Sequence, residues 1–212
     1  MSAICRPEHV YYCMAVLDAE LNKLEDPDPA EFLEDEEREK EYPLFITWNK
    51  YDSTDHSHSP SLRGCIGCFS PLPLEEGLKE YALTSALKDT RFRPIKSSEL
   101  PSLQCGVSLL TPFQPTRDPL DWKIGTHGIH ITFHARGHRY SGTYLPDVMP
   151  AQGWNQVEAI QSLCRKAGWR EKVEPGGEVW KSIELKTYTS EKCTRDWEDY
   201  VEWRKGKGGE EE

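Results

Sequence analysis

The sequence has no long apolar run. Its hydrophobic stretches are only a handful of residues long, whereas a helix that spans a bilayer needs about 20 apolar residues. The first residues, MSAICRPEHV, also lack the apolar region of a secretory signal peptide. We therefore expect no membrane segment and a location in the cytoplasm, the nucleus or both. The seven cysteines, an odd number, agree with a reduced intracellular protein.

Common enzyme motifs are absent as well. The chain contains none of the patterns GxxxxGK(S/T), GxGxxG, GxSxG or HExxH. These patterns hold phosphates, expose a nucleophilic serine or bind zinc, so their absence argues against nucleotide-dependent enzymes and the usual hydrolases. We predict no cofactor.

Two groups of side chains have the composition of a metal site without its geometry. Cys65 and Cys68 form a single CxxC, with His56 and His58 earlier in the chain. On a strand, a spacing of three residues places the two sulfurs on opposite faces, and HxH in a polar loop is usually solvated. The second group is His127, His130, His134 and His138. His130 and His134 share the polar face of a strand and the other two lie near turns, which accounts for their positions without a metal. We predict no metal site.

The charge of the chain is acidic and unevenly distributed. The net charge is −10, which argues against non-specific binding of nucleic acid and makes a nucleic-acid partner improbable. Residues 25–41 hold ten acidic and two basic residues, a net charge of −8. We expect this segment to form a solvated loop or a short helix. The rest of the chain is close to neutral, so local basic patches matter.

Hydrophobic spacing predicts a mixture of helices and strands. Helices are expected to begin near Pro7, at Pro73, after the N-cap Asn155 with its Glu158, and from Ser190 onward. Strands are expected at residues 43–50, 62–69, 103–111 and 179–188, with a hairpin at 128–134 and 139–145. The strands are joined by short links, so most pairs must be antiparallel, and the fold class is α+β. Aromatic residues make up 10% of the chain, too many for a disordered protein. We expect one domain over residues 7–203, with flexible termini at 1–6 and 204–212.

The hexapeptide LRGCIG, residues 62–67, is the most unusual local sequence. Gly64 and Gly67 allow a close approach of the backbone to a ligand, or a bulge. Arg63 and Cys65 lie on one face of a strand, where a nearby cation favours the nucleophilic thiolate. The plain alternative is a Cys65 packed as a small apolar residue, with Arg63 holding a carboxylate. Outside the hexapeptide, His127 is retained as a candidate base.

The segment SALKDTRFRP, at the end of the helix that begins at Pro73, concentrates charge. Lys88, Asp89, Arg91 and Arg93 lie there beside Phe92. A lysine in the last turn suits the negative end of the helix dipole, which is a purely structural explanation. The alternative is a rim that binds anions, with Arg91 offering its planar fork to a carboxylate or phosphate.

Seven segments together resemble the AMMECR family. They are YPLFITW, LRGCIGCF, LKEYALTSALKDTRF, ELPSLQCGVSLLT, LDWKIGTHGIHITF, TYLPDV and QGWNQVEAIQSLCRKAGW. SIELKTYTSEK extends the match, so that the resemblance covers roughly Pro7 to Tyr200. The resemblance implies an α+β fold with a larger antiparallel sheet flanked by helices and a smaller lobe packed on it. It also implies that the hexapeptide is the functional site. The residues carried over are Leu62, Arg63, Gly64, Cys65, Ile66 and Gly67, with Lys88, Asp89, Arg91 and Phe92 from a second segment. Cys68 stands where the family often has Thr.

Three functions are compatible with these residues. The first is an intracellular regulatory or adaptor protein that binds a peptide or small anion at the hexapeptide. The second is a thiol-dependent enzyme, with Cys65 as nucleophile, Arg63 stabilising the thiolate, His127 as base and the Gly67 amide as oxyanion donor. The third is a component of an RNA or protein modification pathway, which prokaryotic fusions within the family suggest.

Overall fold

The structure is a computed structural model that describes residues 4–52 and 59–208. His56 and His58 lie outside the described residues. The chain forms two compact units, one of residues 1–109 and 191–212 and one of residues 110–190. We call them unit 1 and unit 2. Each contains helices and a four-stranded sheet, and the strand pairs described below are antiparallel, so the predicted α+β class is confirmed.

The sheet of unit 1 has the strand order β2-β1-β3-β8. Its strands are β1 (Glu41–Lys50), β2 (Ser61–Pro73), β3 (Leu103–Leu110) and β8 (Ser190–Asp196). β1 pairs antiparallel with β2 on one side and with β3 on the other. The strand that carries the hexapeptide, β2, is therefore at an edge of the sheet.

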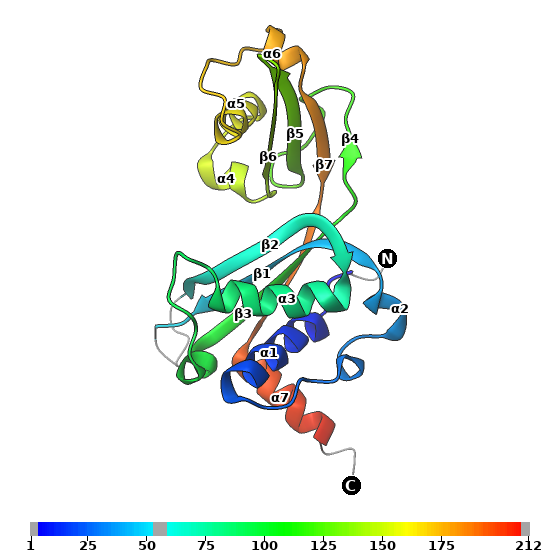
Figure 1. Ribbon diagram of the computed structural model, residues 1–212, viewed down its shortest axis with the longest axis vertical. Helices are drawn as coiled ribbons and strands as arrows, with labels where there is room; N and C mark the ends of the chain where they lie inside the picture. The colour runs from blue at the N-terminus through cyan, green and yellow to red at the C-terminus, as the bar shows by residue number, and fades with distance from the viewer. Residues whose placement is uncertain (1–3, 53–58, 209–212) are drawn as a thin grey trace. The chain divides into compact units, whose positions relative to one another are not determined.

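Helices cover one face of this sheet (Figure 1). They are α1 (Pro7–Asn22) and α3 (Leu74–Leu87), with η2 (Ser97–Ser102) before β3 and α7 (Trp197–Gly208) at the end of the unit. Alternate residues of β1 point to the helices and are fully buried: Leu44, Ile46 and Trp48. The indole of Trp48 also donates a hydrogen bond to the carbonyl of Ala82 in α3, 3.1 Å away. The period-2 pattern of β1 thus sets the core of unit 1.

The acidic segment combines short helices with buried apolar residues. It contains η1 (Pro29–Glu31) and α2 (Asp35–Arg38), which agrees with the predicted loop or short helix. It is not solvated throughout, however, because Phe32 and Leu33 are only 3% exposed. Phe32 packs against Tyr12 and Trp203, which explains why this charged segment stays on the body of unit 1.

Unit 2 has a separate sheet and a separate core. The strand order is β4-β7-β5-β6, formed by β4 (Gln114–Pro115), β5 (Gly128–Ala135), β6 (His138–Tyr144) and β7 (Glu184–Tyr188). Its helices are α4 (Val148–Gln152), α5 (Gln156–Lys166) and α6 (Glu178–Lys181). The apolar side of β5 is fully buried and consists of Ile129, Ile131 and Phe133. The predicted hairpin and the N-cap Asn155, which accepts a bond from the Glu158 amide, are both confirmed.

Two of the predicted elements need correction. Residues 179–188 do not form one strand, because α6 occupies 178–181 and buries Trp180 before β7 begins at Glu184. The final helix begins at Trp197 instead of Ser190, since residues 190–196 form β8. The sequence SEKCTRD shows no apolar alternation, and its strand conformation comes from pairing at the edge of the sheet.

The ends of the described chain are tied to unit 1. The amide of Ile4 donates a hydrogen bond to Glu191 in β8, 2.7 Å away, and Cys5 is buried. At the other end, α7 continues to Gly208, beyond the expected boundary at residue 203. None of the helices in the described ranges is both long and apolar enough to pass through a bilayer.

Candidate functional site

The hexapeptide lies in the first half of β2 and contains an irregularity at Arg63. Trp48 of β1 is opposite Gly64, but the next residue of β1, Asn49, is opposite Leu62. Arg63 is therefore an extra residue in β2, which is a β-bulge, and bulges redirect side chains. The strict alternation expected for Arg63 and Cys65 is interrupted here.

The space beside Gly64 and Gly67, where a side chain would lie, is filled by the protein's own backbone. A Cβ atom at Gly64 would lie 2.2 Å from the carbonyl oxygen of Ser85 in α3. At Gly67 it would lie 2.1 Å from the carbonyl oxygen of Leu44, with the Phe45 ring also in contact. These glycines allow β2 to approach α3 and β1 closely, so their absence of side chains is explained without a ligand.

The guanidinium of Arg63 is fully engaged within unit 1. Its Nε and Nη2 donate to the two carboxylate oxygens of Glu99, each over 3.1 Å. Nη1 donates to the carbonyl of Arg93 over 2.7 Å, and Nη2 also reaches the carbonyl of Pro94. The side chains of Arg63 and Glu99 are only 14% and 15% exposed. Of the two interpretations of Arg63, the structure matches the one in which it holds a carboxylate.

Glu99 is the partner that sequence analysis missed. Burial by itself would raise the pKa of Glu99, but hydrogen bonds from Arg63, the Lys96 amide and Lys50 outweigh it and hold that pKa at about 2. Glu99 is therefore a carboxylate at neutral pH. It lies 36 residues from Arg63, and no local pattern connects two positions that far apart. The one local signal is Lys96, whose amide binds the Glu99 carboxylate three residues later.

A second ion pair covers the free edge of β2 at Cys65. The carboxylate of Asp89 accepts the Cys65 amide proton over 2.9 Å, and Nη2 of Arg91 donates to the Cys65 carbonyl over 3.0 Å. The Arg91 guanidinium also donates two hydrogen bonds to the Asp89 carboxylate, of 3.0 and 2.7 Å. The pair supplies the donor and the acceptor that a neighbouring strand would supply, and it blocks strand addition at this point. The Arg91 guanidinium holds the pKa of Asp89 well below its usual range.

The Cys65 thiol is half-buried, and among the described residues a hydroxyl group is its hydrogen-bond partner. The Thr47 hydroxyl donates to its Sγ over 3.3 Å. Arg63, the predicted stabiliser of a thiolate, is committed to Glu99 instead. Cys68 pairs with Leu44 on the opposite face, as predicted, and its thiol bonds to the Ser70 carbonyl. Within residues 4–52 and 59–208, no group of three His, Cys, Asp or Glu side chains is placed to hold a metal ion.

His127, the candidate base, belongs to unit 2. Its Nδ1 accepts a hydrogen bond from the Lys123 amide over 3.1 Å, and its own amide donates to the Lys123 carbonyl. These bonds close a turn before β5 and fix the ring locally. Cys65 belongs to unit 1, and the contacts described for the two residues lie within their own units. The histidine thus has a structural explanation that needs no thiol.

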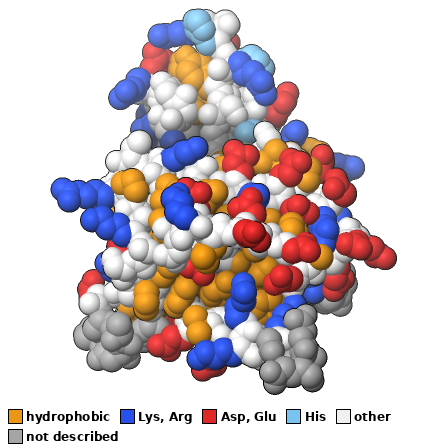
Figure 2. All heavy atoms as spheres, turned by 60° about the horizontal axis from the view of Figure 1, so that its bottom comes forward, with side chains coloured by type: hydrophobic (Ala, Val, Ile, Leu, Met, Phe, Trp, Pro, Cys, Tyr) orange, Lys and Arg blue, Asp and Glu red, His pale blue; other side chains and the backbone are white. Residues whose placement is uncertain are grey.

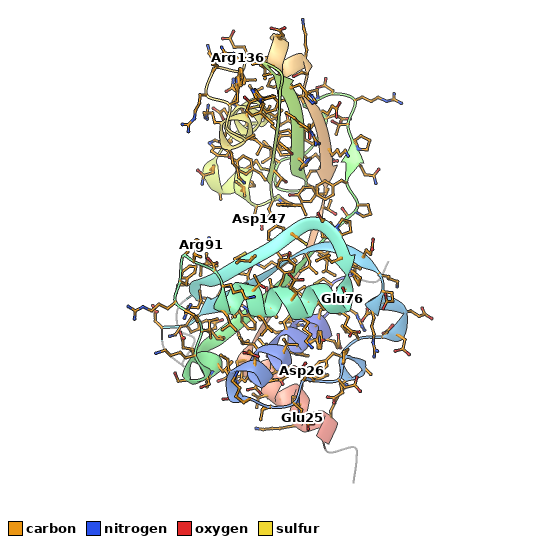
Figure 3. All side chains as sticks on the ribbon, viewed as in Figure 1. Glu25, Asp26, Glu76, Arg91, Arg136 and Asp147 are labelled. Carbon is orange, nitrogen blue, oxygen red and sulfur yellow. The ribbon has the colours of Figure 1, made fainter. Side chains whose placement is uncertain are left out.

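The segment that takes part in these two ion pairs at β2 also carries exposed cations. We call Lys88, Arg91, Arg93 and Lys96 the basic rim. Lys88, Arg93 and Lys96 are exposed and form no ion pair with any residue that the structure describes. Arg91 lies over the Phe92 ring at 5.5 Å, and Leu62, which precedes Arg63 in β2, is 43% exposed. Figure 3 places Arg91 near one end of α3, and Figure 2 shows that Asp and Glu side chains gather mainly on the right of this view, with Lys and Arg side chains among those on the left.

Burial divides the cysteines into two classes, which predicts their order of alkylation. Cys5 and Cys164 are buried, and burial raises the pKa of Cys5 to about 12 and that of Cys164 to about 11. Cys65 and Cys68 are partly exposed. With iodoacetamide at about pH 8, we expect Cys65 and Cys68 to be labelled about tenfold faster than the buried pair, because the thiolate is the reactive form. Peptide mass spectrometry would measure this. Equal rates in the folded protein would contradict the burial described here, and in concentrated urea the difference should vanish.

Comparison with known proteins finds a family model and several relatives that are described as uncharacterised. The family model described as AMMECR1 matches residues 10–193. An uncharacterised protein of Arabidopsis thaliana is 41% identical over 204 residues, covering 95% of this chain and 90% of that protein. An uncharacterised protein of Schizosaccharomyces pombe is 41% identical over 166 residues, covering 77% of this chain and 81% of the other. The crystal structure of an uncharacterised Pyrococcus horikoshii protein matches with a TM-score of 0.67 at 28% identity, over 88% of this chain and 89% of that one.

Proposed function

The chain belongs to the AMMECR1 family, and from the geometry of unit 1 we propose that it is a regulatory or adaptor protein of the cytoplasm or nucleus that binds an anionic ligand, an acidic peptide or a small anion, at the basic rim. The rim side chains supply the charge, and exposed Leu62, the neighbour of Arg63 in β2, supplies an apolar contact. In this proposal the protein performs no chemistry on its ligand.

The observation that carries the proposal is the uncompensated charge of the rim. Three exposed cations lie within nine residues of the chain, and none of them has an ion-pair partner among the described residues: Lys88, Arg93 and Lys96. An exposed group of one sign attracts ligands of the other sign and raises their rate of association. The chain as a whole is acidic, so this patch is the exception to its average charge.

The hexapeptide has an indirect role in this proposal. Arg63 holds the carbonyls of Arg93 and Pro94, and Arg91 holds the Cys65 carbonyl, so that the rim segment is fixed against β2. A ligand that reaches the rim meets groups that are already in place, which reduces the entropy lost on binding. Gly64 and Gly67 act through packing, and Cys65 contributes its backbone groups instead of its thiol.

Charge reversal on the rim tests the proposal. We expect the double variant Lys88→Glu/Arg93→Glu to bind a fluorescein-labelled hexaglutamate peptide about tenfold or more weakly than the wild type, because two attractions become repulsions. Fluorescence anisotropy at low ionic strength measures the affinity. Lys123→Glu/Lys205→Glu is the matched control, since it changes the net charge equally at two exposed lysines outside the rim. Equal affinity of the wild type and the double variant, or no binding by the wild type, would refute the proposal.

The same assay addresses the thiol-dependent alternative. Cys65→Ser removes the sulfur but keeps the backbone bonds to Asp89 and Arg91, so we expect its affinity for the peptide to stay within about twofold of the wild type. A loss as large as that of the rim variant would favour a direct role for the thiol. Retention of labelled RNA that depends on salt and on the rim would instead favour the nucleic-acid alternative.

A further inference from the structure

Unit 2 contains a cavity of about 450 Å³ at the tip of the hairpin formed by β5 and β6. Figure 3 labels Arg136 at this tip, close to α6. The walls are formed by His134, Ala135, Arg136, Trp169, Glu171, Glu178, Val179 and Ser182. A second cavity of about 260 Å³ adjoins it, shares Trp169, Glu171, Glu178 and Val179, and adds Trp180 and Glu174 among others. The space is large enough for an amino-acid side chain with part of its backbone.

The protein places one of its own cations in this cavity. Arg136 has the left-handed φ of 50°, which projects it from the hairpin turn next to Gly137. Its guanidinium lies 5.6 Å from the centre of the Trp169 ring and forms an ion pair with Glu171. The Arg136 side chain is 71% exposed, so it can leave without opening the core.

The aromatic wall is rigid. Trp169 is only 7% exposed, and its ring stands at steep angles to the rings of Phe133 and Tyr140, at centroid distances of 6.4 and 5.6 Å. Phe133 and Tyr140 stack on each other at 5.0 Å. An indole ring fixed in this way presents its face to a cation without losing side-chain entropy on binding.

The cavity also carries more negative charge than its own cations neutralise. Glu171 pairs with Arg136, and Glu174 pairs with Lys172 over 2.6 Å. Glu178 forms no ion pair with another residue in the described part of unit 2. One carboxylate is therefore left over in a space bounded by Trp169 and Trp180, and this arrangement suits a positively charged ligand.

We propose that this cavity binds the guanidinium of an arginine side chain from a partner peptide, and that Arg136 is an internal occupant with which that arginine competes. The incoming guanidinium stacks on Trp169 and binds Glu171 in place of Arg136, with Glu178 as an additional counter-charge. A guanidinium fits better than an ammonium because its planar fork both stacks on an indole and binds a carboxylate through two parallel hydrogen bonds. The site is independent of the basic rim, since it lies in the other unit and takes a ligand of the opposite charge.

Competition predicts opposite effects from two substitutions in the same cavity. We expect Arg136→Ala to bind N-acetyl-arginine amide about tenfold more tightly than the wild type, because the tethered guanidinium no longer occupies the site. Adding Glu171→Gln to that variant should weaken binding again by about tenfold, because the counter-charge is lost. Isothermal titration calorimetry measures the affinities, and the indole N–H signals of Trp169 and Trp180 in NMR spectra report on the location.

Matched controls separate this site from general charge effects. Arg139→Ala removes an exposed arginine of β6 that does not line the cavity, and it should leave the affinity as in the wild type. N-acetyl-citrulline amide, which is neutral and nearly the same shape, should bind to none of the variants. Arg136→Gly repeats the key test with a residue that adopts a left-handed φ without strain, so a folding defect of the alanine variant cannot obscure the result. If neither Arg136 variant binds the arginine amide more tightly than the wild type, or if the citrulline amide binds equally well, the proposal is wrong.

Discussion

Gly64→Ala should lower the free energy of unfolding by about 3 kcal/mol or more, a large effect for the addition of a single methyl group. The new Cβ would lie 2.2 Å from the Ser85 carbonyl oxygen, which is part of the backbone of α3. That helix cannot yield easily, because Ser85 and Ala82 face the buried side of the sheet and the Ala82 carbonyl holds the Trp48 indole. The clash must therefore be relieved by moving a whole helix or the β2 edge.

A glycine of the same sheet provides the control for this prediction. At Gly106 in β3, an added Cβ would meet Cε of Lys192 at 3.2 Å, which is near the flexible end of a side chain. We expect Gly106→Ala to change stability by less than about 1 kcal/mol. Urea unfolding followed by circular dichroism gives both values. Similar midpoints for the two variants would show that α3 does not lie as close to β2 as described.

The elements that the sequence predicts well are those specified by local patterns. The first helix follows from Pro7 and an apolar seam, and α5 follows from Asn155 and Glu158, whose capping bonds involve residues three apart. The hairpin of β5 and β6 follows from the alternation of β5 and from a turn with Gly137. Each of these signals lies within a few residues, so no knowledge of distant contacts is needed.

The elements that sequence reasoning misses depend on distant partners. β8 is polar and becomes a strand only because the edge of the sheet offers it hydrogen bonds. Buried Phe32 and Leu33 in the acidic segment have the same origin, since Tyr12 and Trp203 come from α1 and α7. A window of charged residues cannot reveal that two of its members fill a space between distant helices.

The candidate site depends both on local sequence patterns and on contacts between distant residues. The sequence identifies the unusual residues of the hexapeptide and the charged segment after α3, and the structure does bring Cys65, Asp89 and Arg91 together. The bulge at Arg63 and the partner Glu99 are not visible in the sequence, and together they change the meaning of the arginine. An arginine that points from a regular strand is available to a ligand. The guanidinium of Arg63, in contrast, donates hydrogen bonds to Glu99 and to two backbone carbonyls. The distinction between a binding group and a positioning group therefore rests on tertiary contacts.

Arg63→Met should lower the free energy of unfolding by about 3 kcal/mol at neutral pH and should also flatten its dependence on acid. The methionine keeps part of the volume but leaves the mostly buried Glu99 carboxylate, 15% exposed, without its two bonds from Arg63. Lys50 remains at 3.0 Å as the only cation paired with Glu99 among the described residues, and a single point charge replaces the bidentate contact poorly. The loss is therefore mainly the cost of an inadequately paired buried charge.

The pH dependence follows from the depressed pKa of Glu99. In the unfolded chain a glutamate titrates near its usual value of about 4.3, whereas in the folded protein the pKa of Glu99 is about 2. The unfolded state therefore takes up the proton first as the pH falls. The stabilisation is complete above pH values of about 5, decreases between about 4.3 and 2, and amounts to about 2 to 3 kcal/mol. The variant, in which the pKa of Glu99 is closer to its usual value, should lose less stability over this interval.

Comparison of the two proteins isolates Glu99 from the other acids. Asp89 and Glu37 also have lowered pKa values, through Arg91 in the first case and, against the opposing effect of burial, through Arg6 in the second. Their contributions are common to the wild type and the variant, so they cancel in the difference between the two curves.

Arg139→Met, at an exposed position of β6 in unit 2, should reproduce the wild-type curve within about 0.5 kcal/mol. Parallel curves for the wild type and Arg63→Met between about pH 5 and 2 would mean that Arg63 does not set the charge state of Glu99. The bulge would then have to be explained by the two carbonyl contacts of the guanidinium alone.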